Sequence, residues 1–415
     1  MQTDMNSPAS GRQRTATEIF AVFLKLGLTC FGGPIAHIGY FRREFIERRR
    51  WLDDESFADL VALCQFLPGP ASSQVGFSVG LLRGGWRGGL AAWCGFTLPS
   101  ALLLVAFAAV APDLGGAVGA GFMHGLKRVA VAVVAQAVWD MARRLCPDRR
   151  RAAIALAAMV LLSVLSTVYA QLIVIALGAG LGFMFCRNTS LQNAANSPQA
   201  HVRGFRVSRT AGAVALTLFF VLLFGLPAIV RLGAGHGVSV FDAFYRSGAL
   251  VFGGGHVVLP LLQQQTVATG WVKSNDFLAG YGAAQAVPGP IFTFAAFLGW
   301  MMAEVPNHWS GALLATVGIF LPGLLLVVAA LPYWQAMRAR PSMTAVLSGV
   351  NAAVVGLLAM ALYSPVWISA VKSGSDFAVV SVGFLLLTRW RVAPLAVVGL
   401  CALAGVGEAV LRGGA

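Results

Sequence analysis

The chain has 415 residues, of which 58% are hydrophobic and only 11% are charged, and its net charge is +14. Soluble domains carry about 25% charged residues, so this composition excludes an ordinary soluble protein. Long apolar runs recur along the chain and indicate an all-α polytopic membrane protein. Lys and Arg concentrate in short loops, as cytoplasmic loops require, and no separate basic domain suggests a nucleic-acid partner.

Several other classes are excluded by missing motifs. The six cysteines are scattered without a CxxC pair, and the six histidines show no metal-ligand spacing. A GxxxxGK[ST] phosphate-binding loop is absent as well. We therefore expect neither an enzyme nor a cofactor or metal site.

In chain order, a polar arm at residues 1–16, expected to be cytoplasmic, is followed by four short apolar helices. Each is about 12–16 residues long, which is too short to cross the membrane. The first pair is joined by FGGP at 31–34 and the second by LPGP at 67–70. We expect each pair to form a re-entrant hairpin with its Gly-Pro sequence at the tip. The predicted helices are 17–30, 35–50, 54–67 and 71–82.

The pattern then repeats. FGGP at 31–34 matches FGGG at 252–255, and QFLPGP at 65–70 matches QAVPGP at 285–290. Later matches keep the same order, with an offset that drifts only from about 220 to about 224 residues. The chain therefore reads as two homologous repeats, joined by a linker that contains one connecting span. The predicted boundaries are 17–186 for the first repeat, 187–237 for the linker and 238–415 for the second repeat.

The charges of matching loops indicate that the two repeats have inverted topology. The loop RGGWR at 83–87 carries two arginines, whereas its counterpart AEVPNH at 303–308 carries Glu304 and no Lys or Arg. Four pairs of loops differ in this way. Under the positive-inside rule, we expect about nine full spans and four re-entrant hairpins, or about 13 hydropathy segments. The N-terminus is then cytoplasmic and the C-terminus periplasmic.

The helix breaks are the candidate substrate site. A helix that restarts at a Gly-Pro tip has unpaired N–H groups and about half a positive charge, which binds anions, and inverted-repeat transporters place such breaks near the midplane. The candidate backbone positions are Gly32, Gly33, Gly69, Gly253, Gly254, Gly255 and Gly289. The candidate side-chain donors are Ser72, Ser73, Gln74 and Thr293. The helix-breaking prolines are Pro34, Pro68, Pro70, Pro288 and Pro290.

Two cations and two histidines flank these tips. Lys25 and Arg246 each lie six residues before an FGG sequence, so they are equivalent candidates for binding an anion. The alternative is that each extends to the membrane surface or pairs with a nearby acid, such as Glu18 or Asp242. His37 and His256 follow the tips as candidates for anion or proton binding, or for helix packing.

A gate or coupling site has four further candidates. Lys127 and Arg128 lie early in another span, where only Asn351 and Ala352 correspond to them. They form either a gate or a lipid-facing helix end. Asp140 and Asp242 are the acidic residues closest to membrane depth, and hence the candidates for coupling.

With its duplicated FGG and PGP motifs, the sequence resembles the CHR family of chromate transporters, in the long two-domain bacterial form. The resemblance spans nearly the whole chain, although FGGG in the second repeat departs from FGGP in the first. It implies a secondary transporter, or antiporter, that exports chromate across the bacterial inner membrane, driven by the proton motive force, and confers chromate resistance. Sulfate is the ion that chemically resembles chromate. The residues alone leave open a passive oxyanion channel, a sulfate or molybdate importer of the same fold, and a homodimer.

Overall fold

The computed structural model describes residues 14–165, 170–186, 207–334 and 341–413. Within these ranges every regular element is a helix, which confirms the all-α fold expected from composition. Six of these helices are long and apolar enough to cross a membrane, so the chain is a multi-pass membrane protein. Most of the predicted arm, most of the polar linker and the loop at 335–340 lie outside the described residues. The count of nine spans and four re-entrant hairpins stays a prediction.

Helices stop and restart at both Gly-Pro sequences of the first repeat. Before and after FGGP lie α1 and α2, and before and after LPGP lie α3 and α4. Thr15 and Asp53 cap the N-termini of α1 and α3 through their side chains. The bounds are α1 Ala16–Thr29, α2 Gly33–Arg42 with its π-helical extension η1 Arg43–Arg48, α3 Asp54–Phe66 and α4 Ala71–Val110.

The predicted loop at 83–87 is a sharp turn inside α4. Gly84 and Gly85 leave helical geometry, and Gly85 has φ of 60°. The two arms of α4 then pack so closely that a Cβ at Gly80 would collide with the backbone of Gly88. Gly299 and Gly311 make the corresponding contact between α13 and α14 in the second repeat.

The second repeat begins after α9 and contains the matching breaks. FGGG separates α10 from a 3-10 turn that leads into α11, and VPGP separates α12 from a similar turn that leads into α13. The bounds are α9 Arg209–Arg231, α10 His236–Ala249, η3 Gly255–Val257, α11 Val258–Thr266, α12 Ser274–Ala284, η4 Ile291–Thr293, α13 Phe294–Met301 and α14 His308–Ala330.

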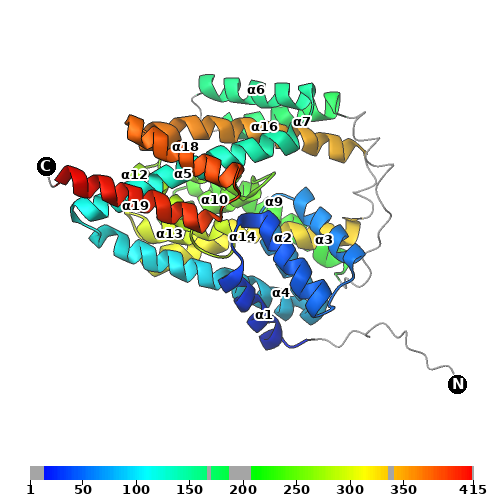
Figure 1. The fold of residues 1–415 in the computed structure, drawn as a ribbon. Coiled ribbons are helices and arrows are strands. Elements are labelled where there is room, and N and C mark those ends of the chain that lie inside the picture. Colours follow the sequence, from blue (N-terminus) through cyan, green and yellow to red (C-terminus); the bar gives the residue numbers. More distant parts are fainter. Residues whose placement is uncertain (1–13, 166–169, 187–206, 335–340, 414–415) are drawn as a thin grey trace.

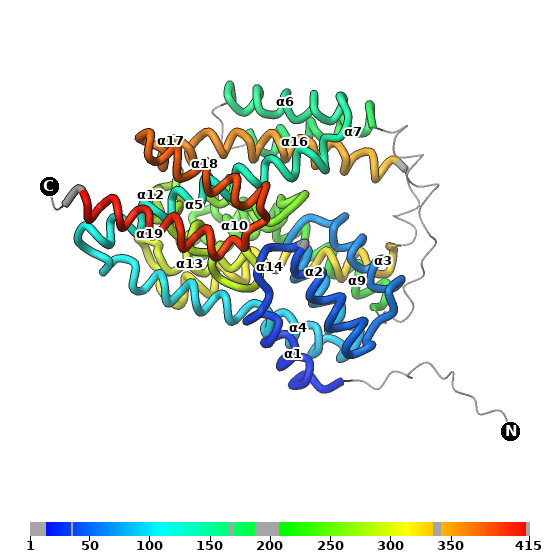
Figure 2. The backbone as a smooth tube through the Cα atoms, viewed as in Figure 1, coloured from blue at the N-terminus to red at the C-terminus, as the bar shows by residue number. Residues whose placement is uncertain are grey.

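The remaining helices pack across the two repeats. The long helix α5 of the first repeat contacts α18 and α19, which end the second, whereas α16 of the second contacts α6 and α7, which end the first (Figure 1). The tube in Figure 2 shows α6 and α1 at opposite ends of the molecule. The bounds are η2 Ala111–Asp113, α5 Gly116–Leu145, α6 Arg149–Val164, α7 Ala170–Phe185, η5 Leu331–Tyr333, α16 Pro341–Ala361, η6 Leu362–Trp367, α17 Ile368–Ala370, α18 Gly374–Thr388 and α19 Pro394–Gly413.

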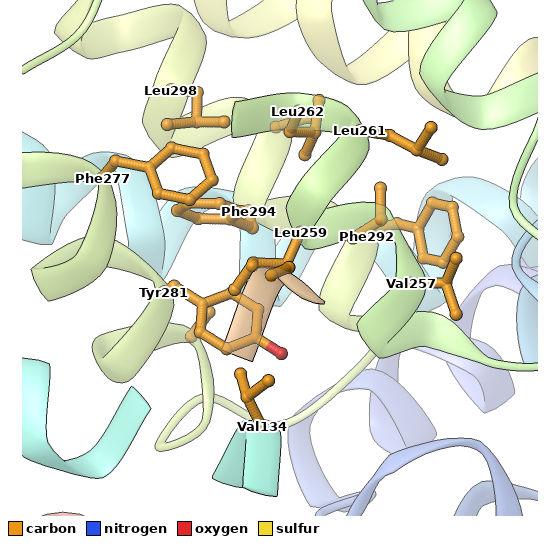
Figure 3. Packing of buried hydrophobic residues seen from close by; sticks show 14 of the residues in the cluster. Val134, Val257, Leu259, Leu261, Leu262, Phe277, Tyr281, Phe292, Phe294 and Leu298 are labelled. Atoms are coloured by element: carbon orange, nitrogen blue, oxygen red, sulfur yellow. The ribbon is translucent and has the colours of Figure 1, made fainter. Parts of the chain in front are cut away.

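The largest hydrophobic core joins both repeats around the breaks of the second. Figure 3 shows Tyr281 of α12 packed among Phe294, Leu259 and Val134, the last of which comes from α5. A second core fills the space between α1, α2, α3 and α4 and includes Val327 of α14. Each core therefore fixes the breaks of one repeat against helices of the other.

Candidate functional site

Two backbone hydrogen bonds connect the tips of one repeat to those of the other. The N–H of Gly69, in LPGP, donates to the carbonyl of Val251 at 2.8 Å, and the N–H of Gly289, in VPGP, donates to the carbonyl of Cys30 at 2.8 Å. Val251 and Cys30 are the residues directly before FGGG and FGGP. Each PGP tip is thus bonded to the FGG tip of the opposite repeat.

The FGG tips also lie against each other. A Cβ at Gly255 would lie 3.8 Å from Cγ of Pro34, and these two residues occupy the same position in FGGG and FGGP. The same Cβ would lie 2.7 Å from Cγ2 of Ile291, the first residue after VPGP. The structure therefore brings together the candidate tip glycines and prolines at one place.

Glycine is required at each break because the chain turns through left-handed backbone geometry there. Gly69 and Gly289 have φ of 118° and 98°, and Gly32 and Gly253 have φ of 97° and 78°. Gly32 and Gly253 are also exposed, whereas Cys30 and Val251, which directly precede the two FGG sequences, are buried. Of the three remaining candidate glycines, Gly33 and Gly254 have positive φ as well, whereas Gly255 does not.

The helices that start at the four tips have no side-chain cap. Their N-cap residues are Gly32, Pro70, Gly254 and Pro290, none of which accepts a hydrogen bond through its side chain. Side chains cap the N-termini of α1, α3, α6, α9 and α18, whereas α5, α10, α12 and α14 lack a side-chain cap as well. A helix start without a side-chain cap leaves its first backbone N–H groups available to an anion. The N–H groups of Gly69 and Gly289 are the exception among the candidate positions, because they donate to Val251 and Cys30.

The side chains that follow LPGP are buried and only partly hydrogen-bonded. Gln74 donates through Nε2 to the carbonyls of Pro68 at 2.9 Å and Gly323 at 3.0 Å, so its amide supports the tip. Gln74 Oε1 and Ser73 Oγ are buried and have no hydrogen-bond partner among the described residues. Pro288 lies in the matching VPGP tip, and Thr293, which follows it, donates to the carbonyl of Pro290 at 2.7 Å.

The two histidines have different partners. His37 is 1% exposed, and its Nδ1 lies 3.3 Å from Oγ of Ser72. His37 Nε2 is buried and unpartnered within the described residues. His256 Nδ1 lies 2.7 Å from the hydroxyl of the fully buried Tyr281. Both histidines therefore sit beside the tips, each hydrogen-bonded on one side.

The paired cations are not in equivalent surroundings. Arg246 forms an ion pair with Asp242 at 2.7 Å, and Asp242 is only 3% exposed. The alternative of pairing with a nearby acid therefore holds for Arg246. Lys25 is exposed, and its side chain makes no ion pair with any described residue, while Glu18 pairs instead with Arg14 and Arg49.

The gate candidates separate into different sites. Arg128 is 1% exposed and lies between Asp376 and Glu408, so the alternative of a lipid-facing helix end is wrong for this residue. Lys127 donates to Oδ1 of Asn275 at 2.9 Å. Asp140 is twelve residues further along α5, about 18 Å away at 1.5 Å per residue. The structure does not bring it to Arg128.

Sequence reasoning missed Asp376, Glu408 and His124, which surround Arg128. They lie at the ends of apolar segments and look like ordinary helix-end polar residues. Asp376 is 248 residues from Arg128, and Glu408 is 280 residues away. A cap motif was the only local signal, because Ser373 and Asp376 form a capping box at the start of α18.

The sequence profile of a family described as chromate transporter matches residues 17–183 and again 238–406. The chain belongs to the chromate transporter family. The chromate transport protein of Pseudomonas aeruginosa is 28% identical over 395 residues, covering 94% of this chain and 91% of that protein. The probable chromate transport protein of Synechococcus elongatus is 28% identical, covering 92% and 93%. The chromate transport protein of Cupriavidus metallidurans is 27% identical, covering 95% and 96%. No solved structure matches the chain significantly.

Proposed function

We propose that this protein is a secondary transporter that exports chromate across the bacterial inner membrane and thereby confers chromate resistance. Its membership of the chromate transporter family supports chromate as the transported ion. The observation that carries the site is the meeting of four uncapped helix ends, joined by the Gly69–Val251 and Gly289–Cys30 hydrogen bonds.

The site suits a tetrahedral dianion for electrostatic reasons. Free N–H groups at a helix start hold negative charge without a formal cation, so they bind an anion and also let it leave. Ser73 adds a hydroxyl beside LPGP that has no hydrogen-bond partner among the described residues. If the Ser72 hydroxyl donates to Nδ1 of His37, Nε2 of that ring carries the proton and is a second buried donor. Sulfate has the same shape and charge as chromate, so it is the expected competitor.

The proposed mechanism uses inverted repeats. In this arrangement the N-terminus is cytoplasmic, the C-terminus is periplasmic, and the two repeats expose the tips to opposite sides in turn. The cross-packing of α5 with α19 and of α16 with α7 supports two intertwined halves that move against each other. In the proposed mechanism the Arg246–Asp242 pair, on the helix that leads into FGGG, senses the anion.

Everted membrane vesicles test this function directly. We expect concentrative uptake of labelled chromate that collapses when an uncoupler is added, with sulfate as a competitor. Dissipative flux that is insensitive to the uncoupler would instead indicate a passive channel. Preferential uptake of sulfate or molybdate, together with better growth on limiting sulfate, would indicate an importer of the same fold.

A further inference from the structure

Three buried polar groups of α4 have no hydrogen-bond partner among the described residues. They are the hydroxyl of Ser73 on the first arm of α4 and, on the second arm, the indole Nε1 of Trp93 and the hydroxyl of Thr97. Ser73 is 1% exposed and Thr97 is 3% exposed. A buried polar group without a partner destabilises a fold, so a group of three requires an explanation. We call Ser73, Trp93 and Thr97 the α4 donors.

Similar groups elsewhere in the chain are hydrogen-bonded. The buried hydroxyl of Thr266 donates to the carbonyl one turn earlier at 2.8 Å, which is the usual bond of a threonine inside a helix. The indole of Trp334 donates to Oδ1 of Asp59 at 3.1 Å. Within the part of the chain that the structure describes, Thr97 and Trp93 make no such bond. Their donors therefore remain available to a ligand.

The turn inside α4 places the three donors at one height along its two arms. The arms run antiparallel, and a Cβ at Gly89 of the second arm would lie 2.9 Å from the ring of Phe77 on the first. Ser73 lies one turn before Phe77, and Trp93 lies one turn after Gly89, so they share that height and the facing sides of the arms. Thr97 follows Trp93 by one further turn on the same side.

The α4 donors lie beside the FGGP tip as well as beside LPGP. His37, which follows FGGP, places Nδ1 3.3 Å from Oγ of Ser72, and its ring meets the ring of Phe96 edge to face at 5.5 Å. Ser72 and Phe96 are the chain neighbours of Ser73 and Thr97. The indole of Trp93 packs against both of the large hydrophobic cores. This is the place where the two repeats meet.

The second repeat contributes aromatic rings at the matching positions. Aligned on the PGP motifs, Ser72 corresponds to Phe292, and aligned on the Leu-Pro pair further along, Thr97 corresponds to Phe320. The ring centroids of Trp93 and Phe320 are 5.8 Å apart, and those of Phe320 and Phe292 are 5.9 Å apart. The two repeats therefore present different surfaces to each other, with polar groups on the first and apolar rings on the second.

We propose that Trp93 and Thr97 bind the oxyanion together with Ser73, so that its side-chain hydrogen bonds come from the first repeat alone. This inference rests on the proposed transport function and adds to it two substrate-binding residues and an asymmetry between the repeats. Chromate and sulfate have four acceptor oxygens and no proton to donate, so they match a set of donors, and hydrogen bonds to an ion are strong. The bound anion supplies the partners that the three groups lack in the empty protein.

The test uses the full chain reconstituted in liposomes. Thr97→Val keeps the shape of the side chain without its hydroxyl, and Trp93→Phe keeps a ring against Phe320 without the N–H. Because each variant loses one hydrogen bond to the anion, we expect the KM of chromate uptake to rise about tenfold and Vmax to stay within about twofold of wild type. Thr97→Ser restores a hydroxyl and should return KM to within about threefold of wild type.

Thermal unfolding of the same proteins separates binding from a structural role. Thr97→Val removes a buried hydroxyl that has no partner among the described residues, so without anion it should unfold at the wild-type temperature or above. Sulfate, which is not an oxidant under these conditions, should raise the unfolding temperature of wild type more than that of the variant. A lower unfolding temperature of the anion-free variant, together with an unchanged KM, would show that the hydroxyl is structural and would overturn the proposal.

The matched control is Thr266→Val, which makes the same change at a buried threonine whose hydroxyl is already bonded within its helix. Its KM should equal that of wild type. The proposal is also overturned if Thr97→Val and Trp93→Phe both keep the wild-type KM, or if the control raises KM as far as they do. Absence of chromate uptake by wild type would overturn the transport function itself, a result distinct from uptake that the variants leave unchanged.

Discussion

The amide of Gly69 donates to the carbonyl of Val251 at 2.8 Å, which bonds the PGP break of the first repeat to the FGG break of the second. The Gly289–Cys30 bond does the same with the repeats exchanged. Because both bonds use backbone atoms, they depend on how closely the tips approach and not on particular side chains. Small changes of volume at the tips should therefore disturb the site strongly.

Replacing a tip glycine tests this dependence. Gly69→Ala places a Cβ 3.0 Å from Cα of Gly323, and Gly289→Ala places one 2.9 Å from Oγ of Ser100, both at positive φ. We expect each variant to lose most chromate transport, with a strain of about 1–2 kcal/mol from the backbone and about 1–3 kcal/mol from overpacking. Vesicle uptake, normalised to the amount of protein in the membrane, measures the effect.

Gly270→Ala is the matched control for that experiment. Gly270 also has positive φ, at 79°, but a Cβ there meets no atom of the described residues within 4 Å. This variant has the backbone strain without the collision, so it should retain transport. Equal losses in Gly270→Ala and Gly69→Ala would show that the close approach of the tips is unimportant.

The Arg246–Asp242 pair allows a charge-binding role to be separated from a structural one. Arg246→Ala leaves the Asp242 carboxylate buried without its partner, which should cost roughly 2 kcal/mol, less than for a fully buried pair. Adding Asp242→Asn should restore much of that stability. If Arg246 attracts the anion, transport stays lost in the double variant.

Thermal unfolding and vesicle uptake on the same preparations give both readouts. Recovery of transport together with stability would show that Arg246 serves only to neutralise Asp242. Lys25→Ala completes the comparison, because Lys25 is exposed and forms no ion pair with any described residue. We expect it to reduce transport without a loss of stability.

The inverted arrangement predicts opposite sidedness for two exposed loops. Trp86 in the loop at 83–87 is 53% exposed, and Val305 in the loop at 303–308 is 76% exposed. In Trp86→Cys and Val305→Cys, a membrane-impermeant thiol reagent should label the first from the cytoplasmic side and the second from the periplasmic side. Labelling of both from one side would rule out inversion of the repeats. The unsubstituted chain corrects for labelling of its six free cysteines.

Low pH should destabilise the start of α3, because its N-cap residue, Asp53, becomes protonated. The N–H of Ser56 donates to Oδ1 of Asp53 at 2.7 Å, and this bond holds the pKa of Asp53 below its ordinary value. A carboxyl with a lowered folded-state pKa stabilises the fold at neutral pH. That contribution disappears as the pH falls below about 4.

Asp53→Asn and Asp53→Ala separate the cap from its charge. Asparagine keeps a cap that does not titrate. As the pH falls from about 5 to about 3, the unfolding temperature of wild type should therefore drop to that of the Asp53→Asn variant or below it. Alanine removes the cap and should cost about 1 kcal/mol already at neutral pH. Unfolding is monitored by the reactivity of buried Cys30 and Cys64 with a fluorogenic thiol reagent. Identical profiles for all three proteins would contradict the assignment.

Local signals were enough to predict the helix breaks. The Gly-Pro pattern fixes where a helix ends regardless of its surroundings, and α3 and α4 begin at Asp54 and Ala71, where the sequence predicts them. The Arg246–Asp242 pair was also visible, because the two residues lie four apart on one helix face. Lys25 has Ala21 in that position, which explains why the two cations differ in their surroundings.

Contacts between the repeats could not be predicted in this way. The Gly69–Val251 bond and the contacts of Arg128 with Asp376 and Glu408 join residues that are far apart in the chain. One sequence contains no information about which distant segments pack together. The sequence also does not reveal that α5 packs against α18 and α19. Amphipathic patterns fail there because membrane helices are apolar on most faces, and small residues rather than hydrophobic stripes mark the interfaces.

The cross-packing of α5 has a consequence for how the protein is made. During synthesis, α5 enters the membrane more than 200 residues before α18 and α19. Until those helices are made, Arg128 and the α5 glycines that pack against α19, Gly121 and Gly125, lack their final partners. Lipid or the insertion machinery must cover this surface until the last helices arrive. Assembly is therefore completed only at the end of translation, and truncation after α16 leaves a buried arginine of the first repeat without its carboxylates.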